Sequence, residues 1–320
     1  MAEVAIGIDV GGTGTKGGLV RPSGEILERI ELPTELQAAT KSILAVAETL
    51  SEKADASQHT VTAVGIGAAG FIDHSSGSVT FSPNLVYDDR QLATAVGLRL
   101  GLPVTVDNDA NAAAWGESMF GAGRGANHVA VLTIGTGIGS GFVIDGLLLR
   151  GKTGAGAELG HMVIDPAGPP CPCGLRGCFE QFASGSAIAR MAREAASQDA
   201  DTLMVELAGG ADRIEGPHVA EAAARHDDAA TKVLRKAGRS LALGISNVVN
   251  LFDPETVVLG GGVVQAGEPL LGVARDELVR MTTEQRRRPV RVTLAALGND
   301  AGIVGAASLA LDELTTKEKR

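Results

Sequence analysis

The sequence predicts a duplicated α/β protein, and three observations support this fold class. The stretch AIGIDVGGTGTKGGLV near the amino terminus and AVLTIGTGIGSGFVI at residues 130–144 share a pattern: an apolar strand, a Gly-Thr-Gly turn and a second apolar strand. Strand-like and helix-like patterns alternate after both stretches, as they do in α/β folds. The length of 320 residues suits two average domains. Two related α/β halves are therefore the simplest expectation.

The first half opens with strands joined by short turns. An apolar run at residues 4–10 leads into a glycine-rich turn over residues 11–18. Longer helix-period patterns and further apolar runs then alternate. The elements expected next are strands at residues 19–20, 26–32, 61–67 and 103–106, a helix at residues 35–53, and an alanine-rich helix that begins within DNDANAAAWGESMF.

The second half continues in the same way after its own glycine-rich turn. Its expected elements are helices at residues 184–197, 219–224 and 229–251, strands at residues 256–259 and 290–294, and a last helix at residues 301–311 that folds back onto the first half. Residues 1–121 plus 301–320 are assigned to a small domain and residues 122–300 to a large one. We expect the tail TTKEKR to be solvated and disordered, and Arg286–Arg288 to be a solvated helix end or an interface.

Composition excludes several classes of function. Apolar residues make up 44% of the chain but aromatic residues only 3%, so the core is aliphatic. The net charge of −10 argues against a nucleic-acid or anionic-membrane surface. No uncharged apolar run is long enough to cross a bilayer, and the early strand leaves no room for a signal peptide. We expect a cytoplasmic protein with reduced thiols and with no nucleic-acid or membrane partner.

Glycine-rich turns at strand ends indicate a nucleotide site. A backbone can wrap a phosphate only where side chains do not block it and several N–H groups point inward. One such turn alone is better explained as an ordinary tight hairpin, because glycine-rich turns are common, but two matching turns in two matching halves favour phosphate binding. The expected nucleotide-binding residues are Asp9, Gly11, Gly12, Thr13, Gly14, Lys16, Thr136 and Gly137, with Gly260, Gly261 and Gly262 open to a flat adenine. Asp9 would hold Mg²⁺ through water.

Three polar residues, Asp107, Asn108 and Asp109, stand where a predicted strand gives way to a helix. Helix capping explains one of them but not three in a row. A carboxylate beside helix N–H groups stays ionised at neutral pH, so it would be a weak base that works by position. This suits phosphoryl transfer to an alcohol, whose proton leaves late. Asp109 is the expected catalytic base, and Asn108 would hydrogen-bond another hydroxyl of the substrate.

All three cysteines lie in HMVIDPAGPPCPCGLRGCFE, residues 161–180. His161, Cys171, Cys173 and Cys178 offer one imidazole and three thiolates, which make a closed tetrahedral zinc site. A redox C-x-C pair would leave His161 and Cys178 unexplained, and plain buried thiols do not favour a Pro- and Gly-rich loop. We expect a structural Zn²⁺ that stabilises a lobe near residues 161–180 and fixes the tautomer of His161, so that its other nitrogen can face a substrate.

Taken together, these segments resemble the ROK family (repressors, open reading frames, kinases) of the actin-like ATPase superfamily, and most closely its bacterial ATP-dependent glucokinases. The resemblance covers nearly the whole chain, and the cysteine segment is its most specific motif. It rests on DVGGTGTK, GIGAAG, VDNDANAAAWGE, LTIGTGIGSG, AELGH, CPCGLRGCFEQ, VLGGG and GNDAGIVGAA. One departure is Gly14, which stands where many relatives carry a lysine. Lys16 would have to supply the positive charge of that lysine in the first turn.

The resemblance implies an actin-like ATPase (ribonuclease H-like) duplicated fold, with two α/β domains around a cleft. It implies that Asp109 is the base, that Gly70 lines the sugar site, and that Asn108, Glu158, His161 and Glu180 hold sugar hydroxyls. The implied reaction transfers phosphate from Mg-ATP to the 6-hydroxyl of glucose and gives glucose 6-phosphate and ADP. The expected partners are glucose, ATP and further copies of the chain, in a homodimer or homotetramer.

Three alternatives to glucose phosphorylation with ATP stay open from the sequence. The first is a kinase of another hexose or N-acetylhexosamine, such as mannose, fructose or N-acetylmannosamine. The second is a sugar-sensing repressor, which would need a DNA-binding segment ahead of the strand at residue 4 and suits the acidic charge poorly. The third is a kinase that uses polyphosphate, which would have little need for the turn at Gly260–Gly262.

Overall fold

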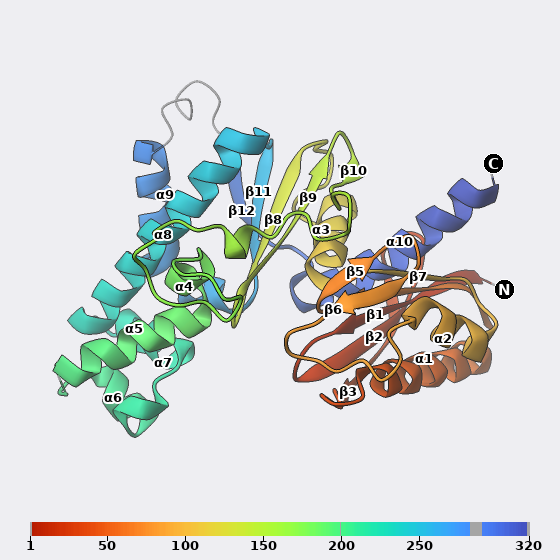
Figure 1. Cartoon of the computed structure of the whole chain (residues 1–320), viewed down its shortest axis with the longest axis horizontal. Coiled ribbons are helices and arrows are strands. Elements are labelled where there is room, and N and C mark those ends of the chain that lie inside the picture. The colour runs from red at the N-terminus through yellow and green to blue at the C-terminus, as the bar shows by residue number, and fades with distance from the viewer. Residues whose placement is uncertain (1, 199, 282–289, 319–320) are drawn as a thin grey trace. The chain divides into compact units, whose positions relative to one another are not determined.

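The computed structural model describes residues 2–198, 200–281 and 290–318 (Figure 1). It divides into two compact units. Unit 1 comprises residues 1–131, 141–157 and 295–320, and unit 2 comprises residues 132–140 and 158–294. The domain boundaries expected at residues 121 and 300 stay a prediction, because compactness alone does not test which segments fold together.

Two five-stranded sheets carry the same strand order, as an internal duplication predicts. The first runs β3 (Ile26–Pro33), β2 (Gly14–Val20), β1 (Ala2–Val10), β4 (His59–Ala68), β7 (Val104–Asn108). The second runs β10 (Leu147–Leu148), β9 (Ile138–Ile144), β8 (Val129–Ile134), β11 (Thr256–Gly260), β12 (Arg291–Leu294). In the first sheet β1 pairs antiparallel with β2 and parallel with β4, and β11 pairs parallel with β12 in the second.

The alternation of side chains along β1 places two helices on opposite faces of the first sheet. Val4, Ile6, Ile8 and Val10 belong to the core cluster that also contains buried residues of α1 (Ala39–Ala56). Ala5 belongs instead to a cluster with Ile303 and Ala307 of α10 (Ala301–Glu318). Because the side-chain period of a strand is two, Asp9 falls on the α10 face, at the carboxyl end of β1.

Glycine allows α10 to approach its neighbours closely. A Cβ on Gly65 of β4 would lie 1.8 Å from the carbonyl oxygen of Ala306, and one on Gly7 would lie 2.0 Å from that of Ile303. A Cβ on Gly305 of α10 would lie 1.7 Å from the carbonyl oxygen of Ala112 in α3 (Asp109–Met119). These contacts are between backbones, which cannot move aside cheaply, so the first sheet, α3 and α10 form one tightly packed body.

A buried carboxylate fixes the return of the chain to unit 1. Glu117, near the end of α3, is 1% exposed and accepts hydrogen bonds from the backbone N–H groups of Ala122 (2.8 Å), Ala296 (3.1 Å) and Leu297 (2.8 Å). Charge-assisted bonds of this kind compensate the loss of water around a carboxylate. Glu117 therefore anchors the segment between β12 and α10.

Unit 2 is mainly helical outside its part of the second sheet. Its helices are α4 (Glu180–Ala183), α5 (Gly185–Gln198), α6 (Leu203–Ala208), α7 (Gly216–Ala224), α8 (Asp228–Phe252) and α9 (Glu268–Met281), with short 3₁₀ turns η1 (Leu159–His161), η2 (Ala211–Arg213) and η3 (Gly262–Ala266). An aliphatic cluster from α5, α6, α7, α8 and α9 forms its core. Among the described residues, no helix is both long enough and apolar enough to span a bilayer.

Several sequence expectations need correction. The turn expected over residues 11–18 is short, because β2 already begins at Gly14. The first helix begins at Ala39 instead of residue 35, and the tail expected to be disordered is helical through Glu318. The hairpin of β5 (Phe71–Asp73) and β6 (Ser78–Phe81), α2 (Leu92–Leu100), α6 and α9 were not expected. The interpretation of Arg286–Arg288 falls outside the described residues.

The close packing of α10 predicts opposite effects for two helical glycines. Gly305→Ala should lower the free energy of unfolding by more than about 2 kcal/mol, because the new methyl group collides with a backbone carbonyl. Gly272→Ala in α9 meets only the flexible end of Glu268, and it should leave stability unchanged or raise it by up to about 1 kcal/mol. Denaturant unfolding of both variants measures the difference, and equal stabilities would contradict this packing.

Candidate functional site

The first glycine-rich turn, residues 11–13, is held firmly but leaves its tip open. Gly11 N–H donates to the carbonyl of Gly14 at 3.0 Å, and the hydroxyl of Thr34 donates to the carbonyl of Gly11 at 2.8 Å. No atom lies within 4 Å of a Cβ built on Gly12, and Gly12 and Thr13 are exposed. The turn therefore has the open backbone that a phosphate would require.

Gly14 does not face this opening. It is buried, and a Cβ at this position would lie 2.6 Å from Oε1 of Glu31 on β3. Lys16, by contrast, lies opposite Asp9 in the β1–β2 register, and its charge opposes the rise in the pKa of Asp9. Lys16 is thus the cation that acts on the carboxylate of this turn.

Asp9 is the penultimate residue of β1 and lies against the first turn of α10, since its Cγ would be 2.7 Å from a Cβ on Gly302. Burial, and next the negative charge of Asp109, raise the pKa of Asp9 to about 7. The two carboxylates are therefore close enough to disfavour each other's ionisation. A divalent cation beside them would relieve this cost, so the donor set fits the Mg²⁺ expected at Asp9.

Asn108 caps α3 and positions the residue that follows it. Its Oδ1 accepts hydrogen bonds from the N–H groups of Ala110 (2.9 Å) and Asn111 (3.1 Å), and its amide donates to the carbonyl of Gly70 at 3.1 Å. Gly70 has a φ of +133°, and a Cβ there would lie 2.4 Å from the carbonyl oxygen of Phe81. Gly70 and Asn108 thus lie together, and the cap and the bond to Gly70 occupy most of the hydrogen-bonding capacity of Asn108.

Asp109 is the first residue of α3, and its pKa shifts in the opposite direction to that expected for a carboxylate beside helix N–H groups. Its Oδ1 accepts a hydrogen bond from the N–H of Ala110 at 2.9 Å. Burial nevertheless outweighs these N–H groups and raises the pKa of Asp109 above its ordinary value. Burial of the Tyr87 hydroxyl and, next, the charge of Asp109 raise the pKa of Tyr87. Asp109 therefore has a higher proton affinity than an exposed helix-cap carboxylate, which favours a general base.

The second glycine-rich turn is fastened to the start of α5 in unit 2. The N–H of Gly185 donates to the carbonyl of Gly135 at 2.7 Å, and that of Ser186 donates to the carbonyl of Thr136 at 3.3 Å. The third turn needs glycine at position 261, which has a φ of +87° and whose Cβ would lie 2.4 Å from the carbonyl oxygen of Ile134. The second and third turns therefore lie side by side, the second directly after β8 and the third directly after β11.

A cavity of about 730 Å³ opens beside these two turns. Gly135, Thr136 and Gly262 line it, as do residues that were not expected from the sequence: Arg193 of α5, Glu215, Pro217 of α7 and Gln265. A capping box at Glu215, with Pro217 in the first turn of α7, marks the helix that closes the cavity. This signal is visible in the sequence, but only the fold brings it next to Gly135. The cavity is of the size that ligand sites have.

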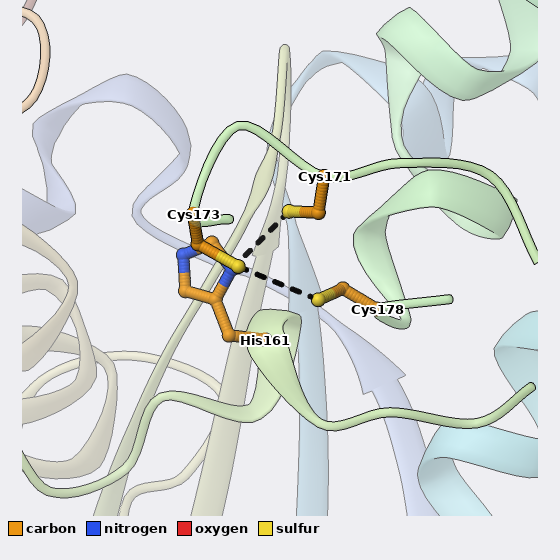
Figure 2. A group of neighbouring side chains, drawn as sticks. All are labelled: His161, Cys171, Cys173 and Cys178. Carbon is orange, nitrogen blue, oxygen red and sulfur yellow. Dashed lines mark hydrogen bonds between the residues drawn. The ribbon is translucent and has the colours of Figure 1, made fainter. Parts of the chain in front are cut away.

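The cysteine lobe is folded by tight turns around its four polar side chains (Figure 2). The N–H of Cys171 donates to the carbonyl of Leu175, and that of Phe179 donates to the carbonyl of Met162, both at 2.8 Å. Gly177 has a φ of +70°, and a Cβ there would lie 1.5 Å from the carbonyl oxygen of Asp165. Fully buried Phe179 packs against Gly244 of α8 and so fixes the lobe to unit 2.

His161, Cys171, Cys173 and Cys178 converge on one point. Their ligand atoms all lie within 4.8 Å of one another, with Cys173 Sγ 3.6 Å from Cys178 Sγ and Cys171 Sγ 3.7 Å from His161 Nδ1. With Zn–S bonds of about 2.3 Å, tetrahedral ligand atoms lie about 3.8 Å apart. The donor set and its spacing therefore fit a closed zinc site, with His161 binding through Nδ1.

The other expected sugar ligands of unit 2 lie beside this lobe. Glu180 Oε1 accepts a hydrogen bond from Cys171 Sγ at 3.1 Å and lies 3.9 Å from His161 Nδ1. Oε2 of the same residue would lie 2.7 Å from a Cβ on Gly137. Glu158 is exposed and precedes η1, whose Leu159 N–H donates to the hydroxyl of Ser140 at 3.1 Å. Asp109, Asn108 and Gly70 belong to unit 1, and Glu158, His161 and Glu180 to unit 2.

The chain is similar over nearly its whole length to proteins of one family. A model described as the ROK family matches residues 5–313. The chain is 40% identical to a glucokinase of Thermotoga maritima over 306 residues, which cover 95% of this chain and 96% of that protein. It is also 40% identical to a glucokinase of Streptomyces coelicolor over 313 residues, which cover 96% of this chain and 97% of the relative.

A solved structure agrees with this similarity. The ROK family glucokinase of Streptomyces griseus, solved in complex with glucose and AMPPNP, is 41% identical to the chain and superposes with a TM-score of 0.85, covering 97% of this chain and 99% of that one. The expected fold class is thereby confirmed as the two-domain actin-like ATPase fold.

Loss of one zinc ligand should separate sugar binding from nucleotide binding. Cys173→Ser should remove bound zinc and weaken glucose binding more than about tenfold, because metal binding supplies the folding energy of the lobe. Nucleotide affinity should change little. Elemental analysis and calorimetric titration with glucose measure both effects. Leu175→Ala, at an exposed position of the same lobe, is the matched control and should retain the metal; normal glucose affinity in zinc-free Cys173→Ser would contradict the role of the lobe.

The raised pKa of Asp9 predicts a pH-dependent gain in stability for Asp9→Asn. The ionised carboxylate is disfavoured in the folded chain, so stability should fall as pH rises from about 4 through 7. In EDTA, Asp9→Asn should match the wild type near pH 4 and exceed it above pH 7 by about 2–4 kcal/mol, since one pKa unit is worth about 1.36 kcal/mol. Urea unfolding across this pH range measures the difference. Asp276→Asn, at an exposed position, is the control. If the stability difference between Asp9→Asn and the wild type is the same at all pH values, the raised pKa of Asp9 is wrong.

Proposed function

The chain belongs to the ROK family, and on this premise we propose that it is a glucokinase. The reaction transfers the γ-phosphoryl group of Mg-ATP to the 6-hydroxyl of glucose and gives glucose 6-phosphate and ADP. The observation that carries this proposal is the 40% identity to two glucokinases over 95–96% of the chain. The similarity to a glucokinase solved with glucose and AMPPNP supports the choice of both substrates.

We assign the nucleotide to the three glycine-rich turns. The cavity beside Gly135 and Gly262 has room for a nucleoside and is lined by residues of α5, α7 and η3. A donor without a base, such as polyphosphate, would make no use of this cavity. The open tip of the first turn, with Lys16 near its base, is suited to the phosphates. These features support ATP as the phosphoryl donor.

Two metal ions complete the proposed site. Asp9 would hold Mg²⁺ through water, and bound Mg²⁺ neutralises charge on the phosphates of a nucleotide. His161, Cys171, Cys173 and Cys178 would hold Zn²⁺, whose role in a closed site is structural. With Nδ1 of His161 on the metal, Nε2 would carry the ring proton and could donate a hydrogen bond to a sugar hydroxyl.

Asp109 is the proposed catalytic base. Its half-buried carboxylate accepts the proton of the 6-hydroxyl as the oxygen of that hydroxyl attacks the γ-phosphorus. Burial raises the proton affinity of Asp109, and the N–H of Ala110 and the cap at Asn108 hold the carboxylate in one orientation. Gly70, Asn108, Glu158, His161 and Glu180 are assigned to the hydroxyls of glucose. A buried site of this kind rejects sugars that leave its polar groups unpaired.

Location and assembly are further parts of the proposal. The three thiols suit a reducing compartment, so we place the protein in the cytoplasm. We also propose a homodimer or homotetramer. Exposed apolar side chains in unit 2, including Leu251 of α8 and Leu294 of β12, support association through this unit.

The choice of substrates is tested by assaying sugars and donors separately. Wild-type protein should convert glucose with ATP at a kcat/KM at least about tenfold above that for mannose, fructose, allose and N-acetylmannosamine, because each change of a bonded hydroxyl costs about 1–3 kcal/mol. Polyphosphate should replace ATP poorly. A higher kcat/KM for any other sugar, or for polyphosphate, would reassign the function within the family.

Replacement of the base should affect turnover far more than binding. Asp109→Asn should lower kcat about 10²–10⁴-fold, the usual contribution of a general base, with only a small change in glucose affinity. A coupled assay for glucose 6-phosphate and a glucose titration give the two values. Asp276→Asn, on the exposed side of α9, should behave like the wild type. Turnover retained in Asp109→Asn would disqualify Asp109 as the base.

A further inference from the structure

A buried carboxylate lies immediately before the residues of the proposed active site. Asp107, in β7, is 3% exposed. Its Oδ1 accepts hydrogen bonds from the backbone N–H of Asn108 (2.8 Å) and from Nδ2 of Asn111 (2.9 Å). Asp107 therefore binds both ends of the first turn of α3, the turn that carries Asp109.

Arg150 supplies the positive charge for this carboxylate. Its Nε donates to Oδ2 of Asp107 at 2.6 Å, and its side chain is only 25% exposed. An ion pair so largely removed from water is costly to break on one side only, because the remaining charge stays buried. Arg150 thus connects the turn that carries Asp109 to the segment of residues 149–157, which follows β10.

The segment of residues 149–157 also packs against β5 and ends next to a proposed sugar ligand. Gly154 has a φ of +79°, and a Cβ there would lie 1.9 Å from the carbonyl oxygen of Ile72 in β5. The N–H of Gly156 donates to the carbonyl of Arg150 at 3.1 Å. Residue 158, the next after the segment, is Glu158. Arg150 therefore lies on the segment that joins β10 of the second sheet to Glu158, and its ion pair with Asp107 ties this segment to β7 of the first sheet.

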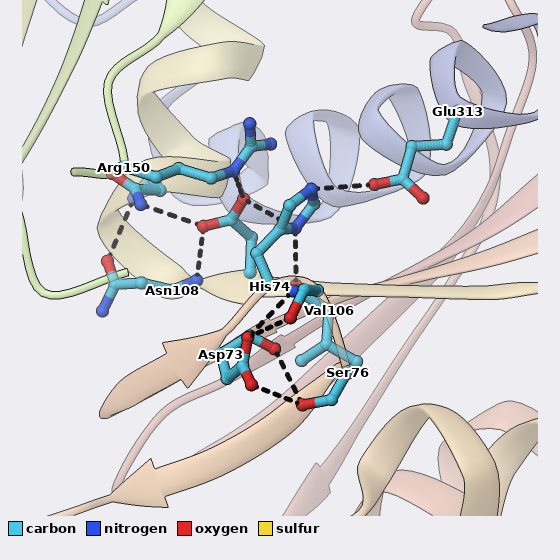
Figure 3. Close-up of polar contacts among 10 residues, drawn as sticks. Asp73, His74, Ser76, Val106, Asn108, Arg150 and Glu313 are labelled. Carbon is cyan, nitrogen blue, oxygen red and sulfur yellow. Dashed lines mark hydrogen bonds and ion pairs between the residues drawn. The ribbon is translucent and has the colours of Figure 1, made fainter. Parts of the chain in front are cut away.

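His74 and Glu313 complete the surroundings of Asp107. Figure 3 shows the imidazole of His74 with one nitrogen toward Glu313 of α10 and the other toward the backbone of Val106. The distances are 3.0 Å from Nε2 to Glu313 Oε1 and 3.7 Å from Nδ1 to Asp107 Oδ2. The hydrogen bond to Glu313 raises the pKa of His74, although burial and Arg150 oppose this rise. With His74 protonated, two cations face two carboxylates.

We propose that Arg150 is a positioning residue for phosphoryl transfer, which acts by holding Asp107 and, through it, the turn that carries Asp109. This role rests on the proposed function. The geometry of a reacting group matters steeply, since a displacement of about 1 Å can cost about 10²-fold in rate. Arg150 belongs to unit 1 and the cavity assigned to the nucleotide belongs to unit 2, so loss of Arg150 should affect turnover and leave nucleotide binding nearly unchanged.

Steady-state kinetics of Arg150→Ala, Arg150→Lys and Arg99→Ala test this role. Arg150→Ala should lower kcat about 10–100-fold with KM for ATP within about twofold of the wild type. Arg150→Lys should recover part of the loss, because it keeps the charge but not the planar group. Arg99, whose Nε contacts Glu48 in the same way but at an exposed site, is the matched control and should retain full activity.

The assays are run well below the thermal midpoint of every variant, so that a loss of stability alone does not lower kcat. Wild-type kcat in Arg150→Ala, an equal loss in Arg99→Ala, or a parallel rise in KM for ATP would overturn the role of Arg150. The wild type itself reports on the proposed function. If it forms no glucose 6-phosphate from glucose and ATP, the glucokinase assignment falls and this role falls with it; if it does and Arg150→Ala is equally active, only the role of Arg150 falls.

Discussion

Burial of carboxylates at the carboxyl ends of two parallel-sheet strands is the constraint on which the site of unit 1 depends. Asp9 is the penultimate residue of β1, Asp107 is the penultimate residue of β7, and Asp109 begins α3 directly after β7. All three belong to the body formed by the first sheet, α3 and α10. Asp107 is compensated by Arg150, whereas the pKa values of Asp9 and Asp109 are raised by burial and, for Asp9, also by the charge of Asp109. One carboxylate is thus structural, and two are available for chemistry.

In unit 2, the expected sugar ligands His161 and Glu180 lie in an irregular segment that must be held in place by other contacts. In the lobe of residues 161–180, fully buried Phe179 packs against Gly244 of α8. Convergence of three thiols and one imidazole gives the lobe a second fixed point, and Glu180 lies within 3.1 Å of one of those thiols. The placement of His161 and Glu180 therefore follows from the geometry of the cysteines.

Glycine has two roles in this chain. In unit 1, Gly7, Gly65 and Gly305 allow backbones to meet without side chains between them. In unit 2, Gly177 and Gly261 occupy left-handed conformations that a side chain would strain. A chain with 43 glycines can therefore be tightly packed. The same composition that indicates phosphate-binding turns also reflects the approach of α10 to the sheet.

The sequence by itself determined the duplicated α/β architecture, the glycine-rich turns and the four side chains that could hold a metal ion, because apolar periodicity and ligand spacing are local properties of the chain. It did not reveal β2 beginning at Gly14, the hairpin of β5 and β6, or the helices α2, α6 and α9. Only the tertiary structure decided that burial raises the pKa of Asp109 and that the side chain of Asn108 mainly caps α3. It also decided that Arg150 pairs with Asp107, which lies 43 positions earlier in the sequence. Burial and ion pairing depend on which segments pack together, and no local pattern records that.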